Sequence, residues 1–390
     1  MSVYDKANKK TGPYKLLALD GGGIRGMITL EVLAKIEATL RESFADKNLV
    51  LADYFDYVAG TSTGAIIATC ISMGWPVDKI QRFYQESGKE MFKKAFITRA
   101  FRTFRYKYED KNLANKLKKE FGKNEFGQEI TFGSEKLKTL LMLVMRNATT
   151  DSPWPMSNNP YAKFNDKEKP DSNLNLPLWQ LVRASTAAPT FFLPEQVQLD
   201  KNKTFSFVDG AITPYNNPAF QLFLMATAEP YNLKWPTGED KMLLVSVGTG
   251  TTPKRNQKPH PLVPGALNNA QNVPHALMLA SQNEQDFLCR IFGKCLSGDA
   301  INSEIGDLIG NQGPLESKLF TYLRYDVELT DKGLDKLGLK GKVNPKDVEK
   351  MDSVKHMNKL TLIGQELAKK VKPEHFENFV QSPASLTTVA

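Results

Sequence analysis

One short segment constrains the fold of this chain more than any other, the run from Tyr54 to Ala68 with Ser62 near its centre. Its mostly apolar first part, 54–59, predicts a strand, and the small apolar residues after Ser62 predict the start of a buried helix. Gly60 and Gly64 flank the serine in the pattern G-x-S-x-G. Between a strand and a helix, this pattern is typical of a nucleophile elbow, in which a strained turn exposes the serine oxygen.

The catalytic interpretation of Ser62 has a structural alternative. G-x-S-x-G arises by chance in many sequences, and serine is also a favoured N-cap residue of helices. The flanking strand and helix favour catalysis, because the free N–H groups at the start of the helix would stabilise negative charge near the serine oxygen.

A second glycine-rich segment, Asp20-Gly-Gly-Gly-Ile-Arg-Gly26, lies between a predicted strand at 15–19 and a predicted helix at 27–40. Three of its glycines match the G-x-G-x-x-G spacing of dinucleotide sites. A dinucleotide site also needs a second strand that ends in an acidic residue about 20 residues after the glycines. In this sequence, that position falls in the polar stretch 46–48, and no strand is predicted before it. Two other interpretations remain, a tight turn without a ligand and an oxyanion loop whose N–H groups face the substrate.

Charge and cysteine content narrow the partners and the compartment. Lys and Arg outnumber Asp and Glu by 51 to 43, a net charge of +8, which favours nucleic acid, an anionic membrane surface or an acidic small molecule as partner. The three cysteines have neither metal-ligand nor disulfide spacing, and no signal peptide or apolar span of about 18 residues is evident. We therefore expect a cytoplasmic protein that associates transiently with membranes.

Basic and aromatic residues alternate between Lys89 and Lys107. Phe92, Phe96, Phe104 and Tyr108 recur at multiples of four, as on one face of a helix. Taken alone, this pattern favours a helix that packs its aromatic face on the core; the functional alternative is a basic amphipathic segment on an anionic membrane. No nucleic-acid recognition motif accompanies the charge, so no nucleic-acid partner is expected.

The remaining chain carries further predicted elements and no internal repeat. Residues 1–13 are expected as a loose lead-in, and 147–176 as a long polar loop that is ordered in part. Strands are predicted at 137–144, 205–208, 243–247 and 319–328, and helices at 77–88, 178–184, 273–291 and 354–371.

Candidate chemistry is concentrated in three loops at predicted strand ends, 20–26, 60–64 and 209–211. Parallel sheets bring such loops to one edge, where ligands bind. A serine hydrolase needs a nucleophile, a base and an oxyanion hole, and these loops offer all three. Asp209 also has a plainer interpretation, because an Asp-Gly pair often holds a turn.

These loops, together with Arg-Ala-Ser-Thr-Ala-Ala-Pro-Thr at 183–190, resemble the motifs of the patatin-like phospholipase family, in the family's order, over residues 14–250. The resemblance implies a three-layer α/β/α fold with a mainly parallel central sheet, and a Ser-Asp dyad that cleaves lipid esters. On that pattern Ser62 is the nucleophile and Asp209 is the base. The oxyanion hole would be formed by the backbone N–H groups of Gly21, Gly22 and Gly23.

The resemblance also implies supporting roles and a substrate. Arg25 would brace the glycine loop, Asp20 would shape it, and the remaining supporting positions are Gly60, Gly64 and Gly210. The implied substrate is a membrane glycerolipid, with no cofactor. The four histidines lie outside the motifs without metal-ligand spacing, so no metal site is expected. Residues 251–390 carry no assignable motif and are interpreted as an extension that packs on the 14–250 core.

Three other functions remain open from the sequence. One is an esterase of the α/β-hydrolase type with a Ser-His-Asp triad, for which His275 stands in a suitable order but next to Pro274 at a predicted helix start. The others are a nucleotide-binding module and a lipid-binding protein with a decayed site. The missing acidic strand end argues against the nucleotide module, and the intact Ser62 and Asp209 argue against decay.

Overall fold

The computed structural model describes residues 2–91, 110–189, 191–253, 266–311 and 313–380. Within these ranges, nine strands form one sheet in the order β5-β6-β3-β2-β1-β7-β9-β8, and β4 pairs with β3 outside this path. The strands are β1 (Tyr14–Leu19), β2 (Tyr57–Thr61), β3 (Leu140–Asn147), β4 (Ser152–Ser157), β5 (Glu195–Asp200), β6 (Lys203–Asp209), β7 (Met242–Val247), β8 (Lys294–Ser297) and β9 (Thr321–Tyr325).

The middle of the sheet is parallel from β3 through β2, β1, β7 and β9 to β8, whereas β4, β5 and β6 are antiparallel to their neighbours. Successive side chains of a strand point to opposite faces. In β1, Leu17 and Leu19 belong to one hydrophobic core, and Leu16 and Ala18 belong to the other. Because both faces are covered, a central strand is apolar at nearly every position, which explains the continuous apolar runs of β1 and β7.

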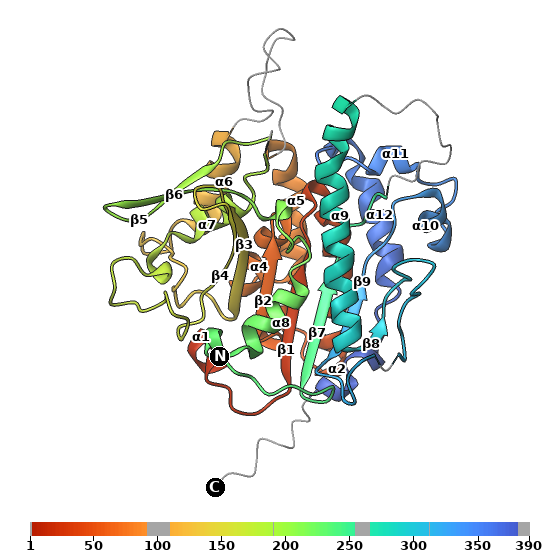
Figure 1. Cartoon of the computed structure of the whole chain (residues 1–390), viewed down its shortest axis with the longest axis horizontal. Coiled ribbons are helices and arrows are strands. Elements are labelled where there is room, and N and C mark those ends of the chain that lie inside the picture. Colours follow the sequence, from red (N-terminus) through yellow and green to blue (C-terminus); the bar gives the residue numbers. More distant parts are fainter. Residues whose placement is uncertain (1, 92–109, 190, 254–265, 312, 381–390) are drawn as a thin grey trace.

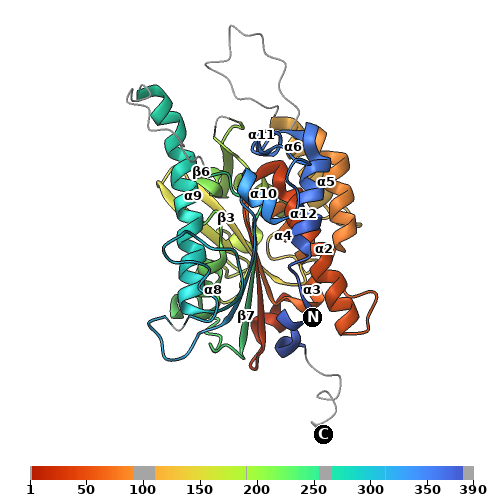
Figure 2. The same cartoon turned by 90° about the vertical axis from the view of Figure 1, so that its right-hand side faces the viewer.

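Helices cover both faces of the sheet and make three layers (Figure 1 and Figure 2). One face packs against α2 (Gly26–Ser43), α4 (Thr63–Ser72), α5 (Val77–Met91), α6 (Asp110–Phe121), α7 (Leu178–Ser185) and α12 (Met357–Ala368). The opposite face packs against α8 (Ala219–Thr227) and the last turns of α9 (Ala266–Phe292). Four short helices complete the list, α1 (Val3–Ala7), α3 (Leu51–Tyr54), α10 (Asp331–Lys336) and α11 (Pro345–Val348). The expected three-layer α/β/α architecture with a mainly parallel sheet is confirmed.

Several boundaries differ from the sequence-based expectations. The strand before Ser62 begins at Tyr57 rather than Tyr54, because 51–54 form α3. The expected loose lead-in is wrong in part, since α1 forms there and its buried Lys6 ammonium donates to the carbonyls of Ala52 and Phe55. The expected loop at 147–176 contains β4, and β5 was not expected because its sequence is largely polar.

The last third of the described chain belongs to the same sheet as residues 14–250. β9 pairs in parallel with β7, from Leu243 opposite Thr321 to Val247 opposite Tyr325. α12 packs along α2, and a Cβ on Gly364 would lie 2.7 Å from the Cβ of Glu31, so these two helices approach closely. Residues beyond 250 therefore form part of the same sheet and helical layer as residues 14–250.

Two sequence-based expectations concern membranes. The basic, aromatic segment 89–107 lies outside the described residues except for the backbone of 89–91 at the end of α5, so both of its interpretations stay predictions. Across the described ranges, none of the helices combines the length and the apolar character that a membrane-spanning segment needs.

Candidate active site

Ser62 occupies the turn between β2 and α4. Its backbone has φ 54° and ψ −119°, a conformation that residues with a side chain rarely adopt. Gly60 and Gly64 make this turn sterically accessible, since a Cβ on Gly60 would collide with the Gly64 carbonyl and a Cβ on Gly64 would collide with the Leu19 carbonyl. The strained serine between two obligatory glycines has the geometry of a nucleophile elbow.

Ser185 of α7 holds the backbone of this turn. The Ser62 N–H donates to Ser185 Oγ at 3.0 Å, and the Ser185 hydroxyl donates to the Val144 carbonyl of β3 at 2.6 Å. Ser185 is fully buried. The motif at 183–190 supported the family resemblance, but it assigned no role to Ser185, because its partner lies 123 residues away in the chain.

The strand register brings Asp209 to Ser62. Met145 of β3 pairs with Trp154 of β4 on one edge and with Asp209 of β6 on the other. β2 pairs with β3 along that second edge and ends where Thr61 lies opposite Val144. The carboxyl ends of β2 and β6 therefore meet. This corrects one expectation, because β6 is antiparallel to β3 and delivers Asp209 from the opposite direction rather than from the carboxyl edge of a parallel sheet.

The two side chains are in direct contact. Ser62 Oγ donates to Asp209 Oδ2 at 2.6 Å, and the Ala211 N–H donates to Asp209 Oδ1 at 2.8 Å. Gly210 begins the short turn after β6 that carries this N–H. Asp209 is 2% exposed, and this burial raises the pKa of its carboxyl group to about 6. The hydrogen bonds from Ser62 and Ala211 and the positive charge of Arg183 lower the same pKa, but by less than burial raises it. A carboxylate with raised proton affinity is a better base for a hydroxyl proton.

The structure places each of the three described histidines beside a group other than Ser62 and Asp209. His275 Nε2 lies 3.0 Å from Thr252 Oγ1, and His375 Nδ1 lies 2.7 Å from the Tyr325 hydroxyl. His356 Nε2 lies 3.7 Å from Asp347, and His260 falls outside the described residues. The geometry around Ser62 thus favours a dyad over the triad alternative.

The glycine loop lies directly beside the elbow, since a Cβ on Gly64 would come within 2.8 Å of the Asp20 carbonyl. The Gly21 N–H donates to the Asn216 carbonyl at 3.1 Å, so it is already engaged. The N–H groups of Gly22 and Gly23 have no acceptor among the described residues. The expected oxyanion hole is therefore narrowed from three N–H groups to two.

Asp20 anchors this loop through residues from the last third of the chain. Its carboxylate is fully buried and accepts two hydrogen bonds from Arg324 of β9, at 2.9 and 2.6 Å, and one from Gln282 of α9 at 3.2 Å. Burial raises the pKa of Asp20 to about 6, against the lowering effect of the Arg324 charge. The Met351 carbonyl also accepts from the Ile24 N–H at 2.9 Å. No sequence motif marked Arg324, Gln282 or Met351.

Arg25 is buried next to this anchor. Its side chain is 3% exposed, and burial lowers its pKa to about 10 while the nearby Asp326 charge acts in the opposite direction. Arg25 Nε and Nη1 have no hydrogen-bond partner among the described residues. No hydrogen bond from Nε or Nη1 fixes the loop, so the expectation that Arg25 braces it stays a prediction.

Within the described ranges, no group of three or more His, Cys, Asp and Glu side chains is arranged to hold a metal ion. Cys70, Cys289 and Cys295 are buried free thiols. The expectation of metal-independent chemistry stays a prediction, and its test is given below.

Comparisons with known proteins agree with these motifs. A family model described as patatin-like phospholipase matches residues 17–223. Patatin-T5 of Solanum tuberosum is 29% identical over 256 residues, and patatin-like protein 1 of Arabidopsis thaliana is 31% identical over 268 residues. These alignments cover 61% and 62% of this chain, and the chain spans 60% of the length of either relative.

A search of solved structures found VipD from Legionella pneumophila, with a TM-score of 0.34 and 14% identity, over 92% of this chain and 67% of that one. A similarity at this level adds nothing to the assignment. The family model, in contrast, spans more than half of the chain and includes the glycine loop, the elbow and the Asp209 turn. The chain belongs to the patatin-like phospholipase family.

Proposed function

We propose that this protein is a lipid acyl hydrolase of the phospholipase A or lysophospholipase type, which cleaves carboxylic esters of membrane glycerolipids. The observation that carries the proposal is the 2.6 Å hydrogen bond from Ser62 Oγ to the buried carboxylate of Asp209. Family membership supports a lipid ester as substrate.

In the first step, Asp209 accepts the Ser62 hydroxyl proton while Oγ attacks the ester carbonyl carbon. Negative charge develops on the carbonyl oxygen, and the unengaged N–H groups of Gly22 and Gly23 stabilise it. When the tetrahedral intermediate collapses, the bond to the alcohol oxygen breaks. Asp209 returns the proton to this oxygen, and the acyl group remains on Ser62.

In the second step, a water molecule gives its proton to Asp209 and attacks the acyl carbon. The second tetrahedral intermediate breaks at the Ser62 oxygen, which takes the proton back from Asp209. A free fatty acid is released and both residues return to their starting states. One carboxylate serves as base and acid in turn, because its raised pKa of about 6 lies close to neutral pH.

A panel of defined phospholipids, lysophospholipids and galactolipids, assayed in EDTA, tests this proposal. We expect fatty acid and a deacylated lipid as products, at a rate that EDTA leaves unchanged, since the chemistry assigned to Ser62 and Asp209 requires no metal. Products are identified by mass spectrometry. Release of a phosphorylated head group would contradict the ester specificity. Loss of activity in EDTA that calcium restores would contradict the metal-independent mechanism.

We further propose that the protein acts as a cytoplasmic enzyme that binds membranes peripherally, with the net charge of +8 and the segment 89–107 as support. Charge reversal of Lys93, Lys94, Arg99 and Arg102 is expected to weaken sedimentation with anionic vesicles, as added salt does. Hydrolysis of a soluble short-chain ester should stay near the wild-type rate. An equal loss on both substrates would show that the segment stabilises the core instead.

A further inference from the structure

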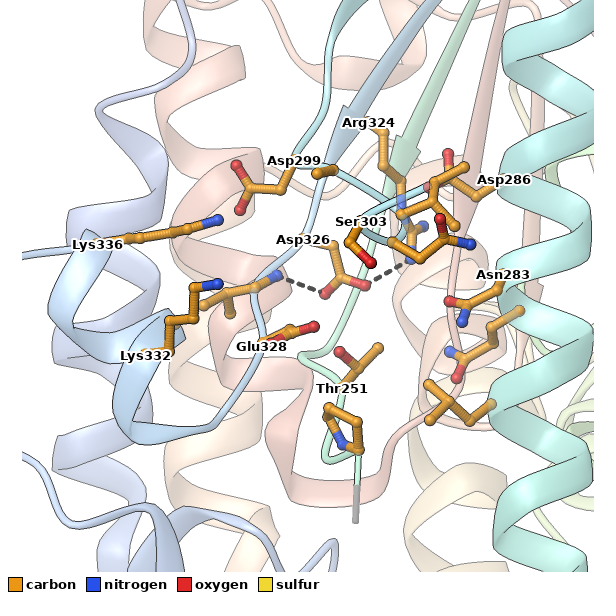
Figure 3. A pocket seen from close by; sticks show the side chains of 18 of the residues that line it. Thr251, Asn283, Asp286, Asp299, Ser303, Arg324, Asp326, Glu328, Lys332 and Lys336 are labelled. Carbon is orange, nitrogen blue, oxygen red and sulfur yellow. Dashed lines mark hydrogen bonds and ion pairs between the residues drawn. The ribbon is translucent and has the colours of Figure 1, made fainter. Parts of the chain in front are cut away.

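A cavity lies at the carboxyl ends of β7, β8 and β9, between α9 and α10, and has a volume of about 420 Å³. Neither Ser62 nor Asp209 lines it. Figure 3 shows its polar side chains converging from the two helices and from the loops after the strands. Its inner wall contains Arg290 and Arg324, which are 2% and 4% exposed. The volume falls in the range of small-molecule sites, which is roughly 300–1,000 Å³.

The acidic side chains of the cavity are already engaged within the protein. Both arginines are engaged as well. The Arg290 guanidinium donates to the Asp286 carboxylate and to two backbone carbonyls. The Arg324 guanidinium donates to the carboxylates of Asp20 and Asp326. The four carboxylates accept as follows: Asp286 from Arg290, Asp299 from Lys370, Asp326 from Arg324 and Glu328 from Thr330.

Four side chains that line the cavity can donate hydrogen bonds and are unengaged among the described residues. Lys332 and Lys336 lie four residues apart on α10, and Figure 3 shows both ammonium groups pointing into the cavity. Neither forms an ion pair or hydrogen bond with any residue that the structure describes, and the same is true of the side chains of Asn283 and Ser303. Two free ammonium groups, an amide and a hydroxyl match a ligand that is anionic and rich in acceptors.

The cavity shares side chains with the anchor of the glycine loop. Arg324 and Gln282 line the cavity and donate to the buried carboxylate of Asp20, the residue that precedes Gly21. Asp326, another lining residue, accepts from Arg324 and from the Gly250 N–H. One side chain, that of Arg324 or of Gln282, and the Asp20 carboxylate thus connect the cavity wall to the proposed oxyanion loop.

We propose that this cavity binds a small anionic ligand that carries a phosphate or carboxylate group, and that the bound ligand increases ester hydrolysis by stabilising the existing contacts of Arg324 and Gln282 with Asp20. Lys332 and Lys336 bind the anionic group. The effect on hydrolysis rests on the proposed function, whereas binding at the cavity does not depend on it.

Binding is tested on the full chain with inorganic phosphate, pyrophosphate and citrate as soluble anions, and with glycerol 3-phosphate as a lipid head group. Ionic strength is held constant. We expect at least one probe to raise Tm saturably, by about 3 °C at a roughly hundred-fold excess over Kd. The double variant Lys332→Glu/Lys336→Glu should lose this rise. The double variant Lys342→Glu/Lys350→Glu, which makes the same charge change at exposed lysines outside the cavity, should keep it.

These measurements distinguish a lipid head group from a free anion as the ligand, and they test binding at the cavity separately from ester hydrolysis. A response to glycerol 3-phosphate but not to phosphate, pyrophosphate or citrate shows that the site recognises the glycerol phosphate unit of lipid head groups, and the converse assigns the site to a free anion without that unit. Ser62→Ala should bind the probe as wild type does, so binding is scored even if hydrolysis fails. Equal Tm shifts in wild type and the Lys332/Lys336 variant would overturn the site. Binding without a rise in hydrolysis of roughly 5-fold would overturn the coupling.

Discussion

Replacing Ser62 by alanine is expected to lower kcat/KM for ester hydrolysis by roughly 10⁴-fold or more, because the acyl group has no oxygen on which to form the intermediate. The fold should persist, since alanine takes up less space in the same turn and the Ser62 N–H keeps its bond to Ser185. A fluorophosphonate probe followed by peptide mass spectrometry should label Ser62 in the wild-type protein and nothing in the variant.

Ser134→Ala provides the matched control for this substitution. Ser134 is also partly buried and accepts a hydrogen bond from the Lys136 N–H, but it lines a separate small cleft with Ser2 that does not include Ser62. The Ser134→Ala variant should still be labelled by the fluorophosphonate at Ser62 and should still hydrolyse the ester. Labelling of another serine in the wild-type protein, or hydrolysis by a folded Ser62→Ala variant, would remove the nucleophile assignment.

Replacing Asp209 by asparagine is expected to lower kcat/KM by roughly 10²- to 10⁴-fold, because an amide has the shape of the carboxylate but cannot accept the Ser62 proton. The amide oxygen can still accept from the Ala211 N–H. Burial raises the pKa of Asp209, which means that the folded site disfavours the charged carboxylate, so a neutral amide should not lower Tm. Steady-state kinetics and thermal denaturation measure the two effects.

The pH profile gives an independent test of the base. As the proposed base, Asp209 would act in its carboxylate form, and burial raises its pKa to about 6. The kcat/KM of the wild-type enzyme should therefore be level above that pH and fall as the pH drops below about 6. Asp20 has a raised pKa in the same range, and its protonation would weaken the Arg324 pair, which makes the acid limb steeper.

Histidine substitutions separate the dyad from the triad. His275→Ala, His260→Ala and His356→Ala should each retain most of the wild-type activity, since the described histidines contact other groups. A folded histidine variant that is as inactive as Ser62→Ala would rule out the dyad.

The sequence by itself determined the three loops of the candidate active site. A strained serine needs glycines two residues before and after it, a buried strand needs a continuous apolar run, and both requirements are met by residues that are neighbours in the chain. The elbow at Ser62, the glycine loop after β1 and the turn at Asp209 were therefore visible as local patterns, and so was the α/β class.

Only the tertiary structure decided how these loops are held. Ser185, Gln282 and Arg324 reach the site through contacts across 123, 262 and 304 residues. Isolated polar side chains with such distant partners leave no periodic pattern in the sequence. The same holds for the Gly21 N–H, whose bond to the Asn216 carbonyl depends on how β1 packs beside the turn before α8. The backbone geometry of a turn depends on residues that are adjacent in the chain, so it can be predicted from the sequence. The hydrogen-bond partner of a buried polar group depends on how the whole chain packs, so only the tertiary structure identifies it.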